Sequence, residues 1–219
     1  NSWGKCNVPE GLNNVKAISA GKVHTAVVKE DGTVVAWGNN SYGQCNVPAN
    51  IKNVEAIIAG DYHTTAITKD GVVFAWGWNK FGQWDVPVGL SNVKEISAGM
   101  WNIGVLKEDG TVVVLGDNSF GQCNVPEDLR KVKAISAGWR HLVALRDTGE
   151  VVAWGSNDFG ESNVPEDLIN VKEISAGYTH TVALKEDGTI VTWGSNEYGE
   201  CNVPEDLGKA KAISAGLFY

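Results

Sequence analysis

A unit of 39 residues recurs along the whole chain, and this repeat constrains the fold more than any other feature. Trp37-Gly38 returns as Trp76-Gly77 and at each further step of 39 residues, with Leu115 replacing the Trp in one copy. Six glycines and six prolines keep the same step: Gly21, Gly60, Gly99, Gly138, Gly177 and Gly216, and Pro9, Pro48, Pro87, Pro126, Pro165 and Pro204. No copy carries an insertion or a deletion, so we expect one supersecondary unit per repeat.

The signals within one unit are those of β-strands. Val54–Ala59 is a short apolar run before Gly60, which is typical of a strand buried on both faces. Residues 24–29 and 33–37 flank Asp31-Gly32, and an Asp-Gly pair between such runs predicts a hairpin, because its turn requires positive φ angles. A weaker fourth strand over residues 42–47 ends at Pro48, as expected of an outer edge strand.

Two architectures repeat such a unit, a solenoid and a β-propeller. Four short antiparallel strands in about 40 residues match a propeller blade, so the sequence favours an all-β propeller. We therefore predict one domain over residues 1–219, built from four-stranded antiparallel blades.

The repeat resembles that of the regulator of chromosome condensation family. Residues 132–160 carry its pattern almost unbroken, from Val-Lys-Ala-Ile-Ser-Ala-Gly to Phe-Gly. The length of the unit and its Asn-Val-Pro ending are similar to those of propeller-type β-lactamase inhibitor proteins. The resemblance implies a propeller, usually of seven blades, in which aromatic residues at one blade corner contact an enzyme. It also implies a bacterial secreted or cell-surface protein, whereas free cysteines would favour a reducing compartment.

The two ends of the chain carry the outer parts of a sixth copy. Residues 1–9 match the fourth strand of a unit, and residues 210–219 match the first strand. Together they predict a six-bladed ring closed by both termini, whose closing blade lacks its middle hairpin. Three origins of the missing hairpin stay open: it was cleaved off, it lies outside the structure, or another segment or chain supplies it. Unpaired first and fourth strands would expose sheet edges, which proteins normally avoid. The alternative is a seven-bladed ring with more sequence missing.

The two positions after each Ala-Gly pair vary most between copies, so they are the candidate binding residues. In a ring these positions all face one rim, and five of the six pairs contain an aromatic residue. Tyr, Trp and Arg dominate binding hot spots. We predict partner-binding residues at Asp61, Tyr62, Met100, Trp101, Trp139, Arg140, Tyr178 and Phe218. The alternative is that these side chains cap the strand corners and pack on neighbouring blades.

Trp78 is a further candidate, because it follows a Trp-Gly pair where the other copies have Asn, Asp or Ser. The aromatic residue before the next glycine occurs in all six copies and is expected to belong to the scaffold. These six residues are Trp3, Tyr42, Phe81, Phe120, Phe159 and Tyr198.

Neither the histidines nor the cysteines predict a metal or redox centre. One repeat position, shared with Asn102 and Tyr219, holds His24, His63, His141 and His180. We expect these imidazoles to bond to nearby backbone rather than to a metal ion. Another position, shared with Trp84 and Ser162, holds Cys6, Cys45, Cys123 and Cys201. Equivalent outer positions lie beyond the Cα distance of about 7 Å that a disulfide allows, so we expect free, partly buried thiols.

Charge and motifs exclude several function classes. The net charge of −8 argues against nucleic-acid binding, and against chromatin docking or exchange-factor activity. No apolar run approaches the length of about 18 residues that a membrane span needs. No nucleophile–base set, phosphate-binding loop or Cys-x-x-Cys motif is apparent, so we predict neither an enzyme nor a cofactor.

We therefore predict a protein-binding module that presents an aromatic-rich rim to a partner protein. Inhibition of an enzyme such as a class A β-lactamase is the sharpest form of this prediction. The alternative is a lectin-like propeller that binds carbohydrate on one aromatic platform per blade. Lectin sites usually repeat their polar residues as well, and here those residues differ between copies.

Overall fold

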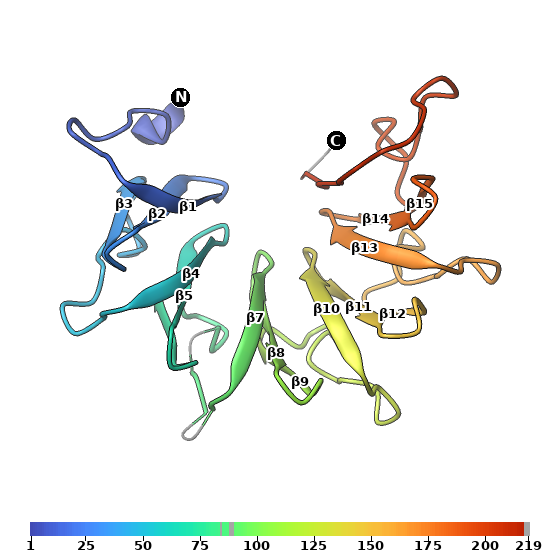
Figure 1. The fold of residues 1–219 in the computed structure, drawn as a ribbon, viewed down its shortest axis with the longest axis horizontal. Helices are drawn as coiled ribbons and strands as arrows, with labels where there is room; N and C mark the ends of the chain where they lie inside the picture. Colours follow the sequence, from blue (N-terminus) through green and yellow to red (C-terminus); the bar gives the residue numbers. More distant parts are fainter. Residues whose placement is uncertain (84, 88–89, 217–219) are drawn as a thin grey trace.

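Five small antiparallel sheets stand side by side in an arc (Figure 1). The structure is a computed structural model and describes residues 1–83, 85–87 and 90–216. A short 3-10 helix, η1 (Ser2–Gly4), precedes the sheets. The strands are β1 (Val15–Ala20), β2 (His24–Lys29) and β3 (Val34–Gly38); β4 (Val54–Ala59), β5 (His63–Thr68) and β6 (Val73–Gly77); β7 (Val93–Ala98), β8 (Asn102–Lys107) and β9 (Val112–Gly116); β10 (Val132–Ala137), β11 (His141–Arg146) and β12 (Val151–Gly155); β13 (Val171–Ala176), β14 (His180–Lys185) and β15 (Ile190–Gly194). The all-β prediction is confirmed, and each sheet forms one blade.

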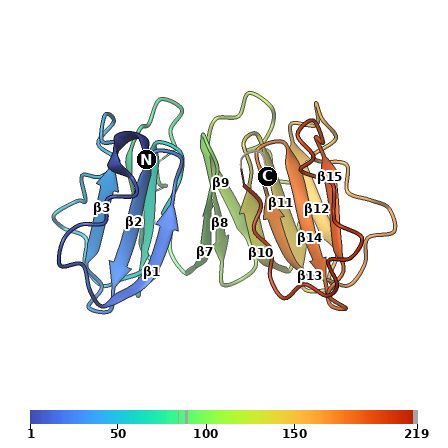
Figure 2. The ribbon, with the colours of Figure 1, turned by 90° about the horizontal axis from the view of Figure 1, so that it is seen from above.

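The blades share one orientation. The first strand of every sheet lies nearest the centre of the arc, and Figure 2 shows the sheets upright beside one another. Each first strand ends at an Ala-Gly corner, and the second strand returns to a hairpin at the opposite end. All corners therefore lie at one rim of the arc, as the sequence predicted. Among the described residues, no helix is long and apolar enough to cross a membrane.

The predicted hairpins form where Asp-Gly occurs. Asp31 Oδ1 accepts hydrogen bonds from Thr33 N at 3.0 Å and Thr33 Oγ1 at 2.7 Å. These bonds lower the pKa of the Asp31 carboxyl. Gly32 has a φ of 79°, and a Cβ atom there would lie 2.9 Å from Asn53 Cα. Only glycine meets both conditions without strain.

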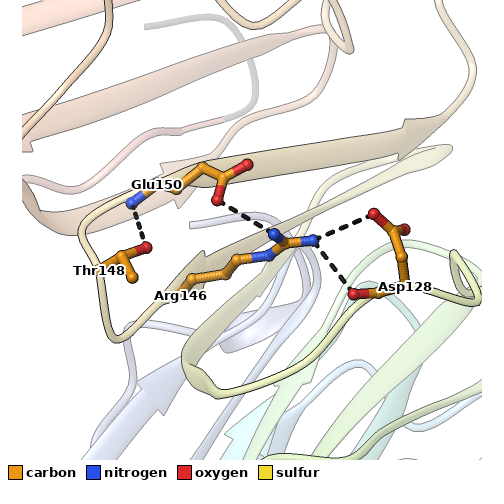
Figure 3. Close-up of polar contacts among 4 residues, drawn as sticks. All are labelled: Asp128, Arg146, Thr148 and Glu150. Carbon is orange, nitrogen blue, oxygen red and sulfur yellow. Dashed lines mark hydrogen bonds and ion pairs between the residues drawn. The ribbon is translucent and has the colours of Figure 1, made fainter.

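The hairpin of the fourth blade keeps only the glycine and compensates with an arginine (Figure 3). Thr148 Oγ1 accepts a longer bond from Glu150 N, at 3.4 Å. Arg146 Nη1 donates to Glu150 Oε2 at 3.0 Å, and Arg146 Nη2 donates to the Asp128 carbonyl at 3.3 Å. The arginine thereby ties this turn to the segment that leads into β10.

The core lies between neighbouring blades. The middle strand of each sheet is buried most completely, and all six residues of β5 are buried. The first strands were predicted to be buried on both faces, but β4 alternates: Val54 and Ile57 are buried, whereas Glu55 is exposed. The prediction failed because Glu55 lies at the surface, where its carboxylate pairs with Lys16 of the preceding blade. Ala26 and Val28 of the first blade pack against Val54 and Ile57 of the second.

The predicted fourth strand over residues 42–47 is not confirmed, since this segment forms turns and each sheet has three strands. Asn40 Oδ1 accepts from Cys45 N at 2.8 Å, and Asn40 Nδ2 donates to Asn46 Oδ1 at 2.7 Å. Gly43 has a φ of 80°. The asparagine side chain therefore provides the bonds that a neighbouring strand would have provided.

The two end segments repeat the contacts of complete copies without forming strands. Asn1 and Asn7 pair through a side-chain bond of 2.6 Å, as Asn40 and Asn46 do in the first full repeat. At the other end, Ala215 N donates to Ser175 Oγ at 2.9 Å. The arc is open between these segments in Figure 1, so the number of blades in a closed ring stays a prediction.

Three kinds of hydrogen bond recur between neighbouring blades. An indole Nε1 donates to a carbonyl of the preceding copy, at 2.9–3.0 Å: Trp37 to Lys5, Trp76 to Gln44, Trp154 to Gln122 and Trp193 to Glu161. A serine hydroxyl accepts from an alanine N of the next blade, at 2.9 Å: Ser19 from Ala59, Ser97 from Ala137, Ser136 from Ala176 and Ser175 from Ala215. A histidine Nε2 meets a threonine hydroxyl at 2.9 Å for His24 and Thr64, and at 3.1 Å for His141 and Thr181.

The boundary between the second and third blades lacks all three links in the described part of the chain. Ile58 replaces the serine, Ile103 replaces the threonine and Leu115 replaces the tryptophan. Ile103 is buried in a cluster with Ile67 and Ile96, and Ile58 packs against it. This boundary is therefore held by apolar packing where the others add buried hydrogen bonds.

Candidate partner-binding site

The first variable corner position lines a cavity at the centre of the arc. The cavity has a volume of about 350 Å³, and the Ala-Gly corners of all six copies form its wall. The variable residues that line it are Lys22, Asp61, Met100, Trp139 and Tyr178. Four predicted partner-binding residues, Asp61, Met100, Trp139 and Tyr178, thus lie at one cavity together with Lys22. Phe218, also predicted, lies outside the described residues.

The second variable position does not line the cavity in the described blades and differs in exposure between them. Tyr62, Trp101 and Arg140 are half-buried. Val23 in the first blade and Thr179 in the fifth are buried, at 3% and 8% exposure. The side chains available to a partner at this position therefore come from the second, third and fourth blades.

Seven aromatic rings form a continuous chain along this rim. Trp78 is its centre, with ring centroids 5.9 Å from Tyr62, 5.9 Å from Tyr42, 5.4 Å from Phe81 and 6.4 Å from Trp101. The chain continues from Trp101 to Trp139 at 5.9 Å, and from Trp139 to Tyr178 at 4.2 Å with nearly parallel rings. We call these seven residues the aromatic rim: Tyr42, Tyr62, Trp78, Phe81, Trp101, Trp139 and Tyr178.

Their recurrence in every copy predicted Tyr42 and Phe81 as scaffold residues, but their rings belong to the aromatic rim. Tyr42 lies 5.6 Å from Tyr62, and Phe81 lies 5.5 Å from Trp101. Phe159, at the same repeat position, is 51% exposed. Tyr42 and Phe81 differ from Phe159 in having Trp78 nearby, because the Trp78 ring lies beside both of them.

Arg140 covers part of the aromatic rim. Its guanidinium carbon lies 3.6 Å from the centroid of Trp139, 4.1 Å from Phe120 and 5.4 Å from Trp101. Arginine over aromatic faces is a stabilising cation–π arrangement. The arginine therefore fixes the positions of the rings around it.

Asp61 is a buried acid at the cavity wall, with 8% of its surface exposed. Its Oδ2 lies 3.5 Å from Lys22 Nζ. Burial raises the pKa of the Asp61 carboxyl, and the positive charge of Lys22 partly offsets this effect. Lys22 Nζ also lies 5.8 Å from the ring centroid of Tyr62.

Trp78 replaces a polar residue that would bond to a buried glutamine, so its presence leaves a buried amide without a hydrogen bond in the described part of the chain. In two other copies that position carries an oxygen that accepts a hydrogen bond from a buried glutamine: Gln44 Nε2 donates to Asn39 Oδ1, and Gln122 Nε2 donates to Asp117 Oδ2, both at 3.0 Å. With Trp78 in place, Gln83 Nε2 is buried without a hydrogen-bond partner among the described residues. Broken local rules of this kind are expected at functional sites.

The histidines lie inside the blades rather than at the rim. Each packs over the corner glycine of its own blade; a Cβ on Gly60 would lie 2.5 Å from the His63 ring. Burial lowers the pKa to about 4 for His24 and His63, and to about 3 for His141. The expected bonds to backbone are corrected for His24 and His141, whose Nε2 atoms meet threonine hydroxyls. Within the described ranges, no three His, Cys, Asp or Glu side chains are grouped to hold a metal ion.

The four cysteines carry free thiols, as predicted. Cys45, Cys123 and Cys201 are half-buried, and Cys6 is exposed. Cys123 Sγ donates to the Asp117 carbonyl at 3.2 Å, and burial followed by the Asp117 charge raises its pKa to about 11.

Comparisons with known structures identify the fold. Yeast RCC1 (Prp20) bound to Kap60 has a TM-score of 0.75 and 24% identity, over 93% of this chain and 66% of that chain. Human WBSCR16 has a TM-score of 0.73 and 20% identity, over 93% and 70%. The ectodomain of the Physcomitrella patens receptor kinase CR4 has a TM-score of 0.77 and 22% identity, over 92% and 56%. The chain therefore spans just under two thirds of the yeast protein's length.

The sequence comparisons assign the family. Among curated protein sequences, none matches significantly. The family described as the regulator of chromosome condensation (RCC1) repeat matches residues 15–44, 54–83, 132–161 and 171–200, which is more than half of the chain. The matched ranges leave out the third copy, in which Asn102 and Leu115 replace the usual His and Trp. The chain belongs to the RCC1 repeat family.

Proposed function

We propose that this chain is a protein-binding module whose contact surface is the aromatic rim. The observation that carries the proposal is the continuous chain of seven rings at one end of the blades, with successive centroids 4.2–6.4 Å apart. The blades do not need this row of rings for stability, because their hydrophobic core lies elsewhere, between the sheets.

The physical properties of the rim suit protein recognition. Tyr, Trp and Arg supply large contact areas at low conformational-entropy cost, and they dominate interface hot spots. Here Trp101 meets Trp78 and Trp139 edge to face, and the Arg140 guanidinium lies over two rings of the aromatic rim, Trp101 and Trp139. A surface ordered before binding loses little further freedom when a partner docks. The yeast relative provides a precedent, since its structure is a complex with Kap60.

The sharpest form of the proposal is inhibition of a secreted enzyme such as a class A β-lactamase. Support comes from the resemblance of the repeat length and ending to the propeller-type inhibitors. The test is nitrocefin hydrolysis by a panel of class A enzymes with the chain added. Inhibition is expected for at least one enzyme. If no enzyme of the panel is inhibited, the β-lactamase inhibitor proposal is refuted.

The rim itself is tested with matched aromatic variants. Trp78→Ala and Trp101→Ala should each weaken binding to a captured partner by about 2 kcal/mol or more, as at other hot spots. Phe159→Ala is the control, because Phe159 occupies the repeat position of Phe81 but lies outside the aromatic rim. Equal losses for all three variants would contradict a specific role of the rim.

The carbohydrate alternative is an outcome of a parallel glycan-array experiment. Sugars stack on open ring faces, whereas Trp139 and Tyr178 cover one face of each other at 4.2 Å. Glycan binding that is lost in Trp101→Ala or Trp139→Ala would replace the protein-binding proposal.

We also propose that further propeller strands, from another segment or chain, cover the outward face of β1. Val15 and Ile18 are 40% and 66% exposed, whereas their equivalents Val54 and Ile57 are 1% and 4% exposed. A peptide of residues 24–38, which carries the repeat's own hairpin, should raise the urea midpoint of the chain. An unchanged midpoint at saturating peptide would contradict the proposal.

A further inference from the structure

The mouth of the central cavity holds a carboxylate whose bonding is incomplete. Asp61 is buried, and its Oδ2 has no hydrogen-bond partner within the described part of the chain. Its ion pair with Lys22 Nζ is 3.5 Å long, compared with about 2.7–2.9 Å for well-formed bonds between charged groups. A buried carboxylate in this setting favours the approach of a better-placed cationic donor.

Lys22 occupies the position that such a cation would take. Its Nζ lies 3.5 Å from Asp61 Oδ2 and 5.8 Å from the Tyr62 ring centroid, and both groups attract positive charge. The Lys22 side chain is 35% exposed, so its flexible stem can move the ammonium into solvent at low cost. The lysine is therefore a resident cation that another cation can displace.

The cavity wall already holds one guanidinium on an aromatic ring, since the Arg140 guanidinium carbon lies 3.6 Å from the Trp139 centroid. Trp139 and Tyr178 both line the cavity and are stacked with an interplanar angle of 7°. Guanidinium groups stack on aromatic faces and pair with carboxylates through two parallel bonds, which ammonium groups do not do. The volume of about 350 Å³ accommodates one long side chain. The chain's net charge of −8 also favours a basic partner.

We propose that the cavity mouth is a subsite for one arginine side chain on a protruding loop of the partner, and that Lys22 occupies it until the partner binds. The assignment of this arginine to a protein partner rests on the proposed function of the aromatic rim. On docking, the guanidinium pairs with Asp61 beside the stacked Trp139 and Tyr178 rings, and the Lys22 ammonium moves into solvent.

The test uses N-acetyl-arginine amide as the probe and N-acetyl-citrulline amide as its neutral isostere, with binding followed by tryptophan fluorescence. The unaltered chain should prefer the arginine probe. Lys22→Met should tighten arginine binding by about tenfold, and Asp61→Asn should weaken it by about tenfold, the range of one desolvated cation contact. Lys29→Met is the matched control, because Lys29 pairs with Asp31 at 3.9 Å at the opposite end of the blade; it should leave binding unchanged.

Equal affinity for the two probes, or no change in Lys22→Met, would overturn the inference. The comparison of probes needs no substitution, so it remains decisive if a variant fails to fold. The probes also need no partner protein. Arginine selectivity combined with rim variants that bind a partner normally would refute the proposed function alone. Rim variants that lose the partner, with probes bound equally, would refute the subsite alone.

Discussion

Two adjacent threonines of β5 test whether hydrogen bonds between blades stabilise this fold. Thr64 and Thr65 are both fully buried. Thr64 Oγ1 donates to the Gln44 carbonyl at 2.7 Å, so its oxygen accepts from His24 Nε2 at 2.9 Å. Thr65 Oγ1 has no partner among the described residues. Substitution by valine removes one hydroxyl in each case and keeps the side-chain shape.

The expected effects have opposite signs. A neutral hydrogen bond contributes about 1 kcal/mol net, so Thr64→Val loses about 2 kcal/mol of the free energy of unfolding. The Gln44 carbonyl keeps the bond from Trp76 at 3.0 Å, so the loss falls mainly on the His24 imidazole. Thr65→Val removes a buried hydroxyl that has no partner, which should stabilise the chain by about 1 kcal/mol.

The measurement is urea unfolding at pH 7.5 for the parent and both variants, followed by tryptophan fluorescence. The two variants should differ by about 3 kcal/mol, with the parent between them. Equal destabilisation by both substitutions would show that the hydroxyl bonds to the neighbouring blade are not the source of the stability, and the reasoning would fail.

Three other predictions follow from buried groups. The pKa values of His24 and His63 are about 4, below the unfolded value of 6.5, so the unfolded chain takes up protons first as the pH falls. The free energy of unfolding should be highest above pH 6.5 and fall as the pH approaches 4, with a loss of about 2 kcal/mol per histidine at pH 5. Urea midpoints that do not change between pH 7.5 and 5 would contradict this prediction. Cys123 should react with iodoacetamide at pH 8 at least tenfold more slowly than the exposed Cys6, because the pKa of the Cys123 thiol is about 11. Peptide mass spectrometry measures both rates, and equal rates would contradict the burial of the Cys123 thiol. Trp154→Leu, which introduces the leucine found in the third blade, should lower the free energy of unfolding in urea by about 3 kcal/mol, because it removes the indole hydrogen bond and leaves a cavity. A loss below about 1 kcal/mol would show that the neighbouring side chains fill the space around the leucine.

The repeat predicted much of the architecture because its signals are local. Asp31-Gly32 defines a turn through its own side chain and its positive φ, so the hairpin and its flanking strands could be predicted. The fixed period placed every corner at one rim. It therefore also identified Tyr62, Trp78 and Trp101, by their difference from the other copies, as candidates for binding.

The predicted fourth strand was not confirmed, and the cause is local. Residues 42–47 resemble an edge strand in composition, but Asn40 satisfies the backbone amide of Cys45 with its side chain. A side chain that bonds to nearby backbone competes with strand pairing. The sequence pattern alone did not reveal which of the two would prevail.

Contacts between copies were decided by the tertiary structure alone. The sequence by itself determined an all-β repeat with variable residues at one end of each blade. It did not determine that Tyr42 and Phe81 join the aromatic rim or that Lys22 faces Asp61. Nor did it determine that the described residues of the second and third blades meet without the recurring hydrogen bonds. The ring contacts join residues 20 positions apart and the Lys22–Asp61 pair joins residues 39 apart, and in each case the distance depends on how neighbouring copies pack. A period within the sequence carries no information about that packing.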